Sequence, residues 1–461
     1  MTITWNVRFI ALVLFEIFYD EVYILHLGAF FVTAIHTNNY PNSYYFASLN
    51  NKDDYPSLSE SISTDICVIG GGFSGVATAL ELAERGYQVV LLEAHKIGWG
   101  ASGRNGGQMI RGIGHDLNVF RKAIGQEGVD AITQMGFEAN QIVIDRINKY
   151  NIDCDLTMGY CDLATRPKHI KALEQEFEAL NNSRYPHPLR LLDQQELNSR
   201  VIGSKNFIGG MEDLGSGHLH PLNLCIGEAQ VAASLGVQIF EQSPVQKIIK
   251  GDKVTVVTDK GQVTANQIVL AGNAYIGDLV PKIAGKVLPA GSYIIATERL
   301  DEELYQQLLP GNHAVCDLKI DLDYFRLSAD KRLLFGGMCN YSARDPKDIK
   351  AALFPKMVNV FPQLKNIKID YQWGGMIGIG ANRLPQIGRL EHNIYYTQAY
   401  SGHGVNVTHM AARLLGEAIS GQSNRIDVFE KVKHMTFPGG KHLRSPLLAM
   451  GMMYHKFMDI F

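Results

Sequence analysis

Residues 65–93 constrain the fold more than any other part of the chain, because they contain every element of a βαβ dinucleotide-binding unit in order. An apolar run at 66–69, typical of a buried strand, leads directly into the G-x-G-x-x-G spacing of Gly70, Gly72 and Gly75. Apolar residues at helical intervals follow, and a second apolar strand comes after them. The run therefore predicts a strand, a glycine turn, a helix and a second strand.

The residue types in this unit suit a bound dinucleotide. Glycines allow backbone amides to approach a pyrophosphate at the helix N-terminus, and Glu93, about 20 residues further on, can accept a hydrogen bond from a ribose hydroxyl. An acid there argues against a 2′-phosphate. The alternative interpretation is a tight turn followed by a surface glutamate. The candidate cofactor ligands of this unit are Gly70, Gly71, Gly72, Ser74, Gly75, Glu93 and Ala94.

Two further glycine clusters have the composition of ligand-binding loops. Residues 98–108 contain five glycines without a helical or strand period, and residues 400–406 precede a helical pattern. A small-residue turn also ends the apolar strand at 267–274. We expect these segments to converge on one cofactor, although 98–108 also suits a flexible surface loop. The candidate ligands here are Ala101, Ser102, Asn105, Gly106, Gly107, Gln108, Val245, Gly272, Asn273, Gly402, Gly404 and Val405.

These segments give the chain a resemblance to a known family. The stretches 100–108 (GASGRNGGQ), 217–224 (GHLHPLNL), 324–327 (YFRL) and 385–389 (PQIGR) are similar to motifs of the D-amino-acid oxidase and glycine/sarcosine oxidase superfamily of FAD-dependent amine oxidoreductases. The resemblance covers about residues 43–461 and is strongest to the members that oxidise gamma-glutamylputrescine. It implies an α/β fold in which a Rossmann-like FAD-binding domain is interleaved with an α+β substrate domain built on a mostly antiparallel sheet.

The resemblance also implies the reaction. The amine lies over the flavin, a hydride leaves the carbon next to nitrogen, and the imine hydrolyses to an aldehyde and ammonia. No second G-x-G-x-x-G follows a strand, so no NADPH site is evident and the reduced flavin must pass its electrons to oxygen or to another diffusible acceptor. The resemblance implies oxygen, with release of hydrogen peroxide. The favoured substrate is gamma-glutamylputrescine, which gives gamma-glutamyl-aminobutyraldehyde. A D-amino-acid or glycine-type oxidase and a non-catalytic flavin-binding protein are the alternatives.

Two side chains are the main candidates for the substrate site. Arg326, on an expected strand, can grip a substrate carboxylate with its planar fork; the alternative is an ion pair with Asp321 or Asp323. His403 is expected near the flavin ring, where a hydrogen bond or a positive charge stabilises reduced flavin, or else it caps the helix. The full set of candidate catalytic residues is His403, Arg326, Tyr324 and Asn406, with Arg104 as the second choice for the carboxylate.

The chain departs from sarcosine oxidases at three positions to which the resemblance assigns a role in those enzymes. Asn406 replaces a carboxylate-binding lysine, Gly375 stands where a cysteine tethers FAD, and Leu334 stands near an oxygen-activating lysine. We therefore expect FAD to be bound non-covalently and sarcosine to be a poor substrate.

The expected domains alternate along the chain. The segments assigned to the FAD-binding domain are 62–157, 206–286 and 367–425. Those assigned to the substrate domain are 158–205 and 287–366, followed by a C-terminal segment at 426–461. Residues 1–40 form an extension outside the resemblance. Charges interrupt its apolar run, so neither a spanning helix nor a signal peptide is expected. The favoured explanation is a start codon assigned too far upstream, and the alternative is a membrane-associating extension.

Composition excludes other classes of function. A net charge of -3 provides no positive electrostatic potential that would attract nucleic acid. The six cysteines include no C-x-x-C pair. Neither a disulfide framework nor a metal site is expected, and free thiols favour a reducing cytoplasm. The expected partners are a small-molecule amine and molecular oxygen, and the sequence leaves the oligomeric state open.

Overall fold

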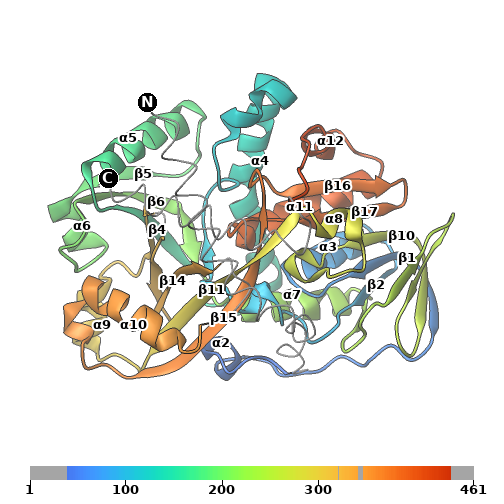
Figure 1. Cartoon of the computed structure of the whole chain (residues 1–461), viewed down its shortest axis with the longest axis horizontal. Helices are drawn as coiled ribbons and strands as arrows, with labels where there is room; N and C mark the ends of the chain where they lie inside the picture. The colour runs from blue at the N-terminus through green and yellow to red at the C-terminus, as the bar shows by residue number, and fades with distance from the viewer. Residues whose placement is uncertain (1–38, 320, 341–345, 438–461) are drawn as a thin grey trace, which may run out of the picture. The chain divides into compact units, whose positions relative to one another are not determined.

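Two β-sheets organise the part of the chain described by the computed structural model, which is residues 39–319, 321–340 and 346–437. The strands of the first sheet are β1 (Ser61–Ile69), β2 (Val89–Leu92), β7 (Gln238–Phe240), β8 (Lys247–Ile249), β9 (Val254–Val257), β10 (Gln262–Leu270), β16 (Gln386–Glu391) and β17 (Ile394–Gln398). The strands of the second sheet are β3 (Gln108–Met109), β4 (Thr157–Ala164), β5 (Leu189–Asp193), β6 (Gly209–His218), β11 (Val287–Thr297), β12 (Ala314–Asp317), β13 (Tyr324–Leu327), β14 (Leu333–Asn340) and β15 (Ile369–Gly380). In Figure 1, β1, β2 and β10 lie on the right and β4, β6, β11 and β14 lie to their left.

The helices of the described residues are α2 (Tyr44–Ala47), α3 (Phe73–Glu84), α4 (Arg121–Tyr150), α5 (Pro167–Asn182), α6 (Gln194–Arg200), α7 (Pro221–Ser234), α8 (Pro281–Ala284), α9 (Glu302–Leu308), α10 (Ile349–Val360), α11 (Gly404–Ile419) and α12 (Ile426–Glu430). Apolar residues of α3, α4, α7 and α11 share one buried cluster with Val68 of β1 and Leu91 of β2. Helix α3 packs on β1 and β2, α7 and α11 pack on α3, and α4 packs on α11.

The first sheet confirms the βαβ prediction. Strand β1 pairs in parallel with β2 on one side and with β10 on the other, and β17 continues the parallel order. Helix α3 connects β1 to β2, and Gly86 after it has φ +86°, a left-handed conformation that glycine adopts without a Cβ penalty. Strands β9 and β10 form a hairpin, because β9 pairs with β10 in antiparallel register.

The second sheet is mostly antiparallel, as predicted, with one parallel pair between β4 and β12. Its buried cluster joins Phe325 of β13 and Phe335 of β14 to Leu353 and Met357 of α10. The predicted α/β architecture with an α+β second domain is therefore confirmed.

Two domain boundaries predicted from the sequence are wrong. The FAD-binding domain was expected to resume at residues 206 and 367, but β6 and β15 both lie in the second sheet. Strand β6 pairs with β4 and β5, and β15 pairs with β11 from Ile369 to Gly380. Each strand leads into an element of the first domain, α7 or β16, so the chain changes domain only after the strand ends.

The segment that begins at Tyr40 is an integral part of the fold. The Tyr40 hydroxyl donates to Ile97 O at 2.6 Å, and the fully buried Tyr45 ring packs edge-on against Trp373 at 5.2 Å. Asn50 N also donates to the side chain of Asn223 at 3.2 Å. The predicted extension was residues 1–40, and residues 1–38 of it lie outside the described residues.

Two N-terminal truncations test whether the fold requires the segment that begins at Tyr40 but not the residues before it. A chain that starts at residue 38 is expected to be soluble, flavin-loaded and active, since the fold contacts above begin at Tyr40. Deletion through Ala47 removes the buried Tyr45 ring and should abolish soluble expression, because losing a buried aromatic side chain alone costs about 3–5 kcal/mol. Flavin content and thermal unfolding of the two proteins test this. Loss of folding in the shorter deletion would contradict it.

A buried charge network joins the helices on the first sheet. Glu228 of α7, with no side-chain exposure, lies 3.1 Å from an Arg146 nitrogen of α4 and 3.0 Å from His409 Nε2 of α11. Burial opposes the charge of this carboxyl, but His409 and Arg146 together lower the pKa of Glu228 below its ordinary value. Its stabilising contribution is therefore present above its unfolded pKa and is lost as pH falls through the lower folded value.

Glu228→Gln should lower the free energy of unfolding by about 3–5 kcal/mol at pH 7, because it removes the buried carboxylate that Arg146 and His409 share, although Arg146 keeps its ion pair with Glu81 at 3.1 Å. The difference from the natural protein should shrink below about pH 4, where the unfolded carboxyl is protonated. Thermal unfolding across pH 3.5–8 measures it, with Glu302→Gln, at an exposed ion pair with Lys331, as the control. An equal effect of both substitutions would contradict the assignment.

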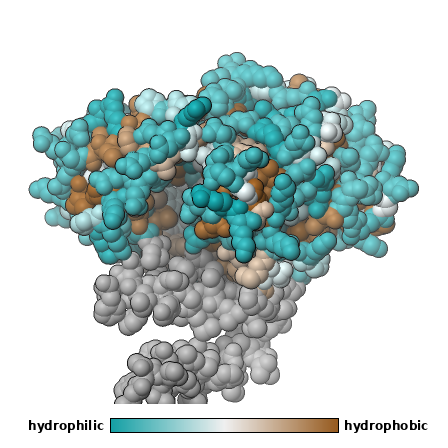
Figure 2. Space-filling view, turned by 90° about the horizontal axis from the view of Figure 1, so that it is seen from above, coloured by the Kyte–Doolittle hydropathy of each residue, from teal (hydrophilic) through white to brown (hydrophobic). Residues whose placement is uncertain are grey.

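The exposed large apolar residues of the described surface include Val119, Leu191, Leu235 and Met435. The face seen in Figure 2 is mainly hydrophilic, with apolar residues in separate small areas. Within the described ranges, no helix has the length and apolar character needed to cross a membrane.

Candidate functional site

Two glycines of the turn between β1 and α3 are required by the fold itself. Gly70 has φ +114°, and a Cβ on it would lie 2.8 Å from Ala271 O at the end of β10. A Cβ on Gly75 would lie 1.7 Å from Gly70 O, so α3 could not pack this closely against β1. The turn therefore sits where β1 and β10 end side by side.

Gly72 is different, because the protein leaves space around it. An added Cβ would meet only Ser102, at 2.8 Å from Oγ, and Gly72 occupies the N-cap of α3 without a side-chain capping bond. The first turn of a helix directs unpaired backbone N–H groups and a partial positive charge outward. This arrangement fits the pyrophosphate of a dinucleotide, which needs close backbone approach and an anion-binding helix end.

Glu93 lies immediately after β2, beside this turn. Its carboxylate accepts from Gly71 N at 2.6 Å and from His95 N at 2.8 Å. Burial raises the pKa of Glu93, while these backbone donors act in the opposite direction. Each carboxylate oxygen keeps a second acceptor position, so the predicted bond from a ribose hydroxyl remains open. The neighbouring Ala94 is exposed.

The loop 98–108 is held by its own side chains, which contradicts the alternative of a flexible surface loop. Asn105 donates to Ala101 O at 3.0 Å and Ser102 O at 2.9 Å, and it accepts from Gly107 N at 2.7 Å. Gln108 donates to Val315 O at 3.1 Å in the second sheet. The donors of these two side-chain amides are therefore used to shape the loop, and Asn105 and Gln108 stay predictions as cofactor ligands.

Ser102 points toward the glycine turn, where its Oγ accepts from Phe73 N at 2.8 Å. Its own proton remains available for a phosphate oxygen. The Ser74 hydroxyl, in contrast, donates to Tyr400 Oη at 2.8 Å, so only its backbone can serve as the predicted ligand. The Ser74–Tyr400 bond joins the first turn of α3 to the glycine cluster before α11.

The remaining predicted cofactor segments meet at the same place. Asn273, after β10, accepts from Ala399 N at 2.9 Å, which places it beside the turn that contains Gly402 at φ +92°. Gly404 and the buried Val405 begin α11. Gly272 precedes Asn273, and Val245 packs at the edge of the cluster that contains Val90 and Leu92. These six positions stay predictions as cofactor ligands.

His403 and Asn406 hold the segment that follows β3. The Nε2 atom of His403 lies 3.0 Å from the carbonyl oxygens of both Ile110 and Arg111. Asn406 donates to Ile110 O at 2.8 Å. Burial lowers the pKa of His403, so the neutral ring is favoured over the positive charge considered above. His403 is the N-cap residue of α11, but its side chain makes no capping bond.

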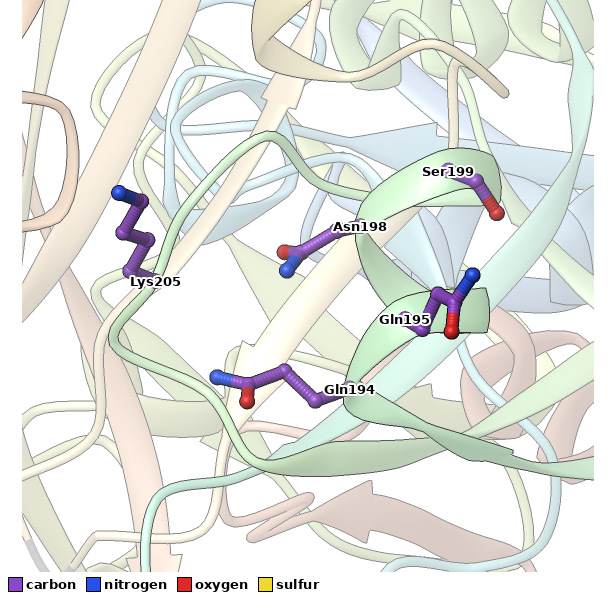
Figure 3. Close-up of a pocket in the computed structure, with 5 residues that line it drawn as sticks. All are labelled: Gln194, Gln195, Asn198, Ser199 and Lys205. Carbon is purple, nitrogen blue, oxygen red and sulfur yellow. The ribbon is translucent and has the colours of Figure 1, made fainter.

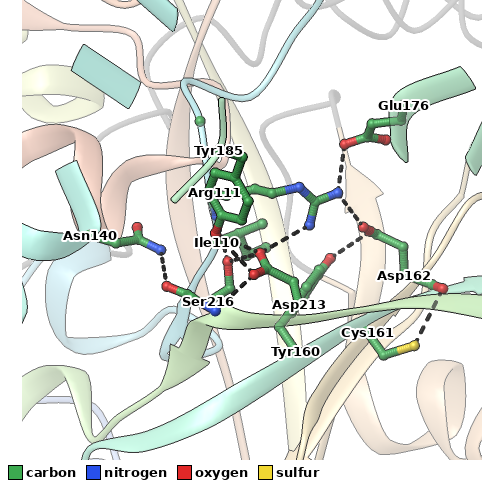
Figure 4. Close-up of polar contacts among 12 residues, drawn as sticks. Ile110, Arg111, Asn140, Tyr160, Cys161, Asp162, Glu176, Tyr185, Asp213 and Ser216 are labelled. Atoms are coloured by element: carbon green, nitrogen blue, oxygen red, sulfur yellow. Dashed lines mark hydrogen bonds and ion pairs between the residues drawn. The ribbon is translucent and has the colours of Figure 1, made fainter. Parts of the chain in front are cut away.

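Arg111 is a residue that the sequence did not indicate. Figure 4 shows its buried guanidinium among Asp162 of β4 at 2.8 Å, Glu176 of α5 at 2.6 Å and Asp213 of β6 at 3.4 Å. Burial opposes its charge, yet these carboxylates raise the pKa of Arg111 well above its ordinary value. Arg111 therefore fixes the second sheet to the segment that contacts His403. No sequence signal was present, because its three partners are far away in the chain.

The prediction that Arg326 grips a substrate carboxylate is wrong. The side chain is 3% exposed, and it donates to Gly106 O at 2.7 Å, Leu219 O at 2.8 Å and Leu327 O at 3.0 Å. A fourth bond reaches the Tyr45 hydroxyl at 3.2 Å. The alternative ion pairs are not formed either, since the nearby aspartates, Asp321 and Asp323, pair with Lys356. Arg326 is a structural residue between the glycine loop and the second sheet.

Tyr324 contacts the loop 98–108, and Arg104 is part of that loop. Tyr324 Oη lies 3.1 Å from Ser292 Oγ, and a Cβ on Gly106 would come within 2.7 Å of its ring. Burial raises the pKa of Tyr324. Arg104 stacks over Trp99 at 4.3 Å and donates to Trp99 O at 2.8 Å, while Gly375 packs against its stem. Arg104 is thus also engaged by the fold.

A pocket elsewhere in the second domain has no part in this arrangement. It lies beside α6, and Figure 3 shows its lining of Gln194, Gln195, Asn198, Ser199 and Lys205. None of these is a candidate ligand. Within the described residues, no group of three or more His, Cys, Asp or Glu side chains is placed to hold a metal ion.

Comparisons with known proteins agree with this architecture. Residues 65–418 match the DAO family, described as FAD dependent oxidoreductase. The chain is 45% identical over 420 residues to the gamma-glutamylputrescine oxidoreductase of Escherichia coli K12, covering 91% of this chain and 98% of that protein. It is 42% identical to the probable oxidoreductase OrdL of Haemophilus influenzae, over 90% of this chain and 97% of that one.

The fold is similar to that of glycine oxidase from Geobacillus kaustophilus, with a TM-score of 0.69 at 18% identity, over 81% of this chain and 100% of that one. The family match spans most of the chain, and it includes the glycine turn, the loop 98–108 and the start of α11. The chain therefore belongs to the DAO family of FAD-dependent oxidoreductases.

Proposed function

We propose that the protein oxidises the terminal primary amine of gamma-glutamylputrescine to gamma-glutamyl-aminobutyraldehyde, with ammonia and hydrogen peroxide as the other products. The observation that carries the proposal is the 45% identity, over nearly the full length of both chains, to a gamma-glutamylputrescine oxidoreductase. FAD, when bound, supplies the two-electron acceptor for the C–H bond next to the amine nitrogen. The chain's own part is to place the cofactor and the amine and to exclude water.

The convergent glycine turns support the cofactor assignment. Gly72 and the first turn of α3 would hold the pyrophosphate, Ser102 would donate to it, and Glu93 would accept from the ribose. The start of α11, with Gly404 and Val405, would supply a partial positive charge to the electron-rich flavin ring. Tyr324 and His403 stay the candidate side chains for contacts with the substrate.

We also propose that FAD is held without a covalent bond. Gly375, at the position of the tethering cysteine, packs against Arg104, and the six cysteines, four of them buried, form no disulfide. Unpaired cysteines also favour a cytoplasmic location. Acid precipitation of the yellow protein should leave intact FAD in the supernatant. Flavin absorbance that stays with the pellet would overturn this part of the proposal.

Product analysis under air tests the full reaction. One equivalent each of aldehyde, ammonia and hydrogen peroxide should appear for every oxygen molecule consumed, because the amine loses two electrons and the imine takes up water. Turnover with an artificial acceptor but not with oxygen would overturn the oxidase assignment. Turnover of D-amino acids or glycine in place of gamma-glutamylputrescine would favour the alternative oxidase.

A further inference from the structure

The turn that leads from β17 into α11 has an uncommon backbone. Ala399 and Ser401 have φ values of +62° and +55°, and Gly402 follows at +92°. Residues with a side chain seldom adopt these left-handed values, so the surrounding structure must hold the turn in place. One support comes from the first turn of α3, where the Ser74 hydroxyl donates to Tyr400 Oη at 2.8 Å. The strained turn therefore lies next to the helix that would hold the pyrophosphate.

Strand β15 of the second sheet supports the same turn from another side. Ser401 N donates to Gly378 O at 2.8 Å, and Gly380 N donates to Ser401 Oγ at 3.3 Å. Because β15 is the last strand of its sheet, its outer edge is open to such bonds. Neither bond reaches Ala399, which is fully buried and whose backbone N–H needs an acceptor of its own.

Asn273 supplies that acceptor. Its side-chain oxygen accepts from Ala399 N at 2.9 Å, across 126 positions of the chain. Asn273 follows the end of β10 at φ +42°, two residues after Ala271. Ala271 lies against the glycine turn, since its carbonyl oxygen would be 2.8 Å from a Cβ on Gly70. Asn273 therefore links the end of β10, beside the glycine turn, to the strained turn before α11.

Gly378 leaves room for this link. A Cβ on Gly378 would lie 2.1 Å from Asn273 Oδ1 and 2.9 Å from its Cγ. Gly378 is not one of the glycines with a positive φ, so its backbone would accept another residue. What excludes a side chain at this position of β15 is the amide of Asn273.

We propose that Asn273 is a positioning residue for the flavin: through Ala399 N it holds the turn 399–402, and with it the first turn of α11, against the cofactor site. This inference rests on the cofactor part of the proposed function and not on the identity of the amine. The partial positive charge at the start of α11 would favour the reduced, negatively charged flavin only if the turn keeps it in place. Without the bond the turn can relax, so FAD should bind less tightly and be harder to reduce.

Two substitutions break the contact from opposite sides. Asn273→Gly removes the side-chain oxygen and keeps a residue that adopts a positive φ without strain. Gly378→Ala keeps the amide but displaces it. Each should weaken FAD binding about 5–10-fold, as expected for one neutral hydrogen bond, and should lower the midpoint potential of the flavin. Dilution of the FAD-loaded protein, followed by the fluorescence of released FAD, gives the dissociation constant, and reduction beside a redox dye gives the potential.

The double variant shows whether both substitutions act on one contact. In the Asn273→Gly protein, Gly378→Ala should have no further effect, because the group that it displaces is absent. Asn312→Gly is the matched control, since Asn312 is also left-handed, at φ +49°, and its Oδ1 has no hydrogen-bond partner among the described residues. It should leave the FAD affinity and the flavin potential unchanged.

Three results would overturn the inference. Natural affinity and potential in Asn273→Gly would mean that asparagine serves only the backbone conformation at this position. Additive losses in the double variant would mean that Gly378 acts separately. An equal fall in the unfolding midpoint of the FAD-free protein, with an unchanged flavin potential, would assign Asn273 a structural role. No amine takes part in these measurements, so a flavin that gamma-glutamylputrescine fails to reduce would overturn the proposed substrate and leave this inference standing.

Discussion

Replacement of Gly72 by valine should give a folded protein with less than about a tenth of the natural flavin content. A side chain at this position occupies the space next to the first turn of α3, where the pyrophosphate must approach the backbone. The protein itself tolerates the change, because an added Cβ contacts only the end of Ser102. Flavin absorbance per chain and far-UV circular dichroism measure the two effects separately.

Two other glycines provide the controls. Gly75→Val should lose the fold as well as the flavin, since its Cβ would lie 1.7 Å from Gly70 O. Gly251→Val, in the exposed turn between β8 and β9, should retain both. Full flavin content in Gly72→Val would show that the cofactor does not lie against this turn.

Arg326→Ala should lower the free energy of unfolding by about 3–5 kcal/mol and reduce turnover of every amine to the same extent. The change leaves the carbonyl oxygens of Gly106, Leu219 and Leu327 without their buried donor, and each unsatisfied group costs about 1–3 kcal/mol. Lysine should restore only part, because it lacks the fork. Thermal unfolding and the ratio of kcat/KM for gamma-glutamylputrescine and putrescine measure the effect.

The matched control is Tyr45→Phe, which removes only the 3.2 Å bond between the Tyr45 hydroxyl and Arg326. It should cost about 1 kcal/mol. A selective loss of activity on gamma-glutamylputrescine, with unchanged unfolding of Arg326→Ala, would return the carboxylate-binding role to Arg326.

Local patterns predicted the fold well where one segment carries the whole signal. The β1, α3 and β2 unit is contiguous, so the glycine turn, the helix after it and the acid at Glu93 could all be located from residue types and spacing. The domain boundaries at β6 and β15 could not be located in this way. The residue pattern of a strand does not identify its sheet, and only its hydrogen-bonding partners decide its domain.

The site shows the same limit. Backbone positions near the cofactor follow from glycine clusters, but the use of each side chain depends on distant partners. The Asn105 side chain shapes its own loop, and Arg326 binds carbonyl oxygens more than 100 residues away, at Gly106 and Leu219. Arg111 was missed for the same reason.

Anaerobic titration of the purified, FAD-loaded protein with gamma-glutamylputrescine tests the central claim most directly. The account predicts that about one equivalent of the amine bleaches the flavin absorbance, because each amine delivers two electrons. Putrescine, which lacks the glutamyl carboxylate, should bleach it only at much higher concentration. A flavin spectrum unchanged by excess gamma-glutamylputrescine would contradict the assignment of this protein as an amine oxidase with that substrate.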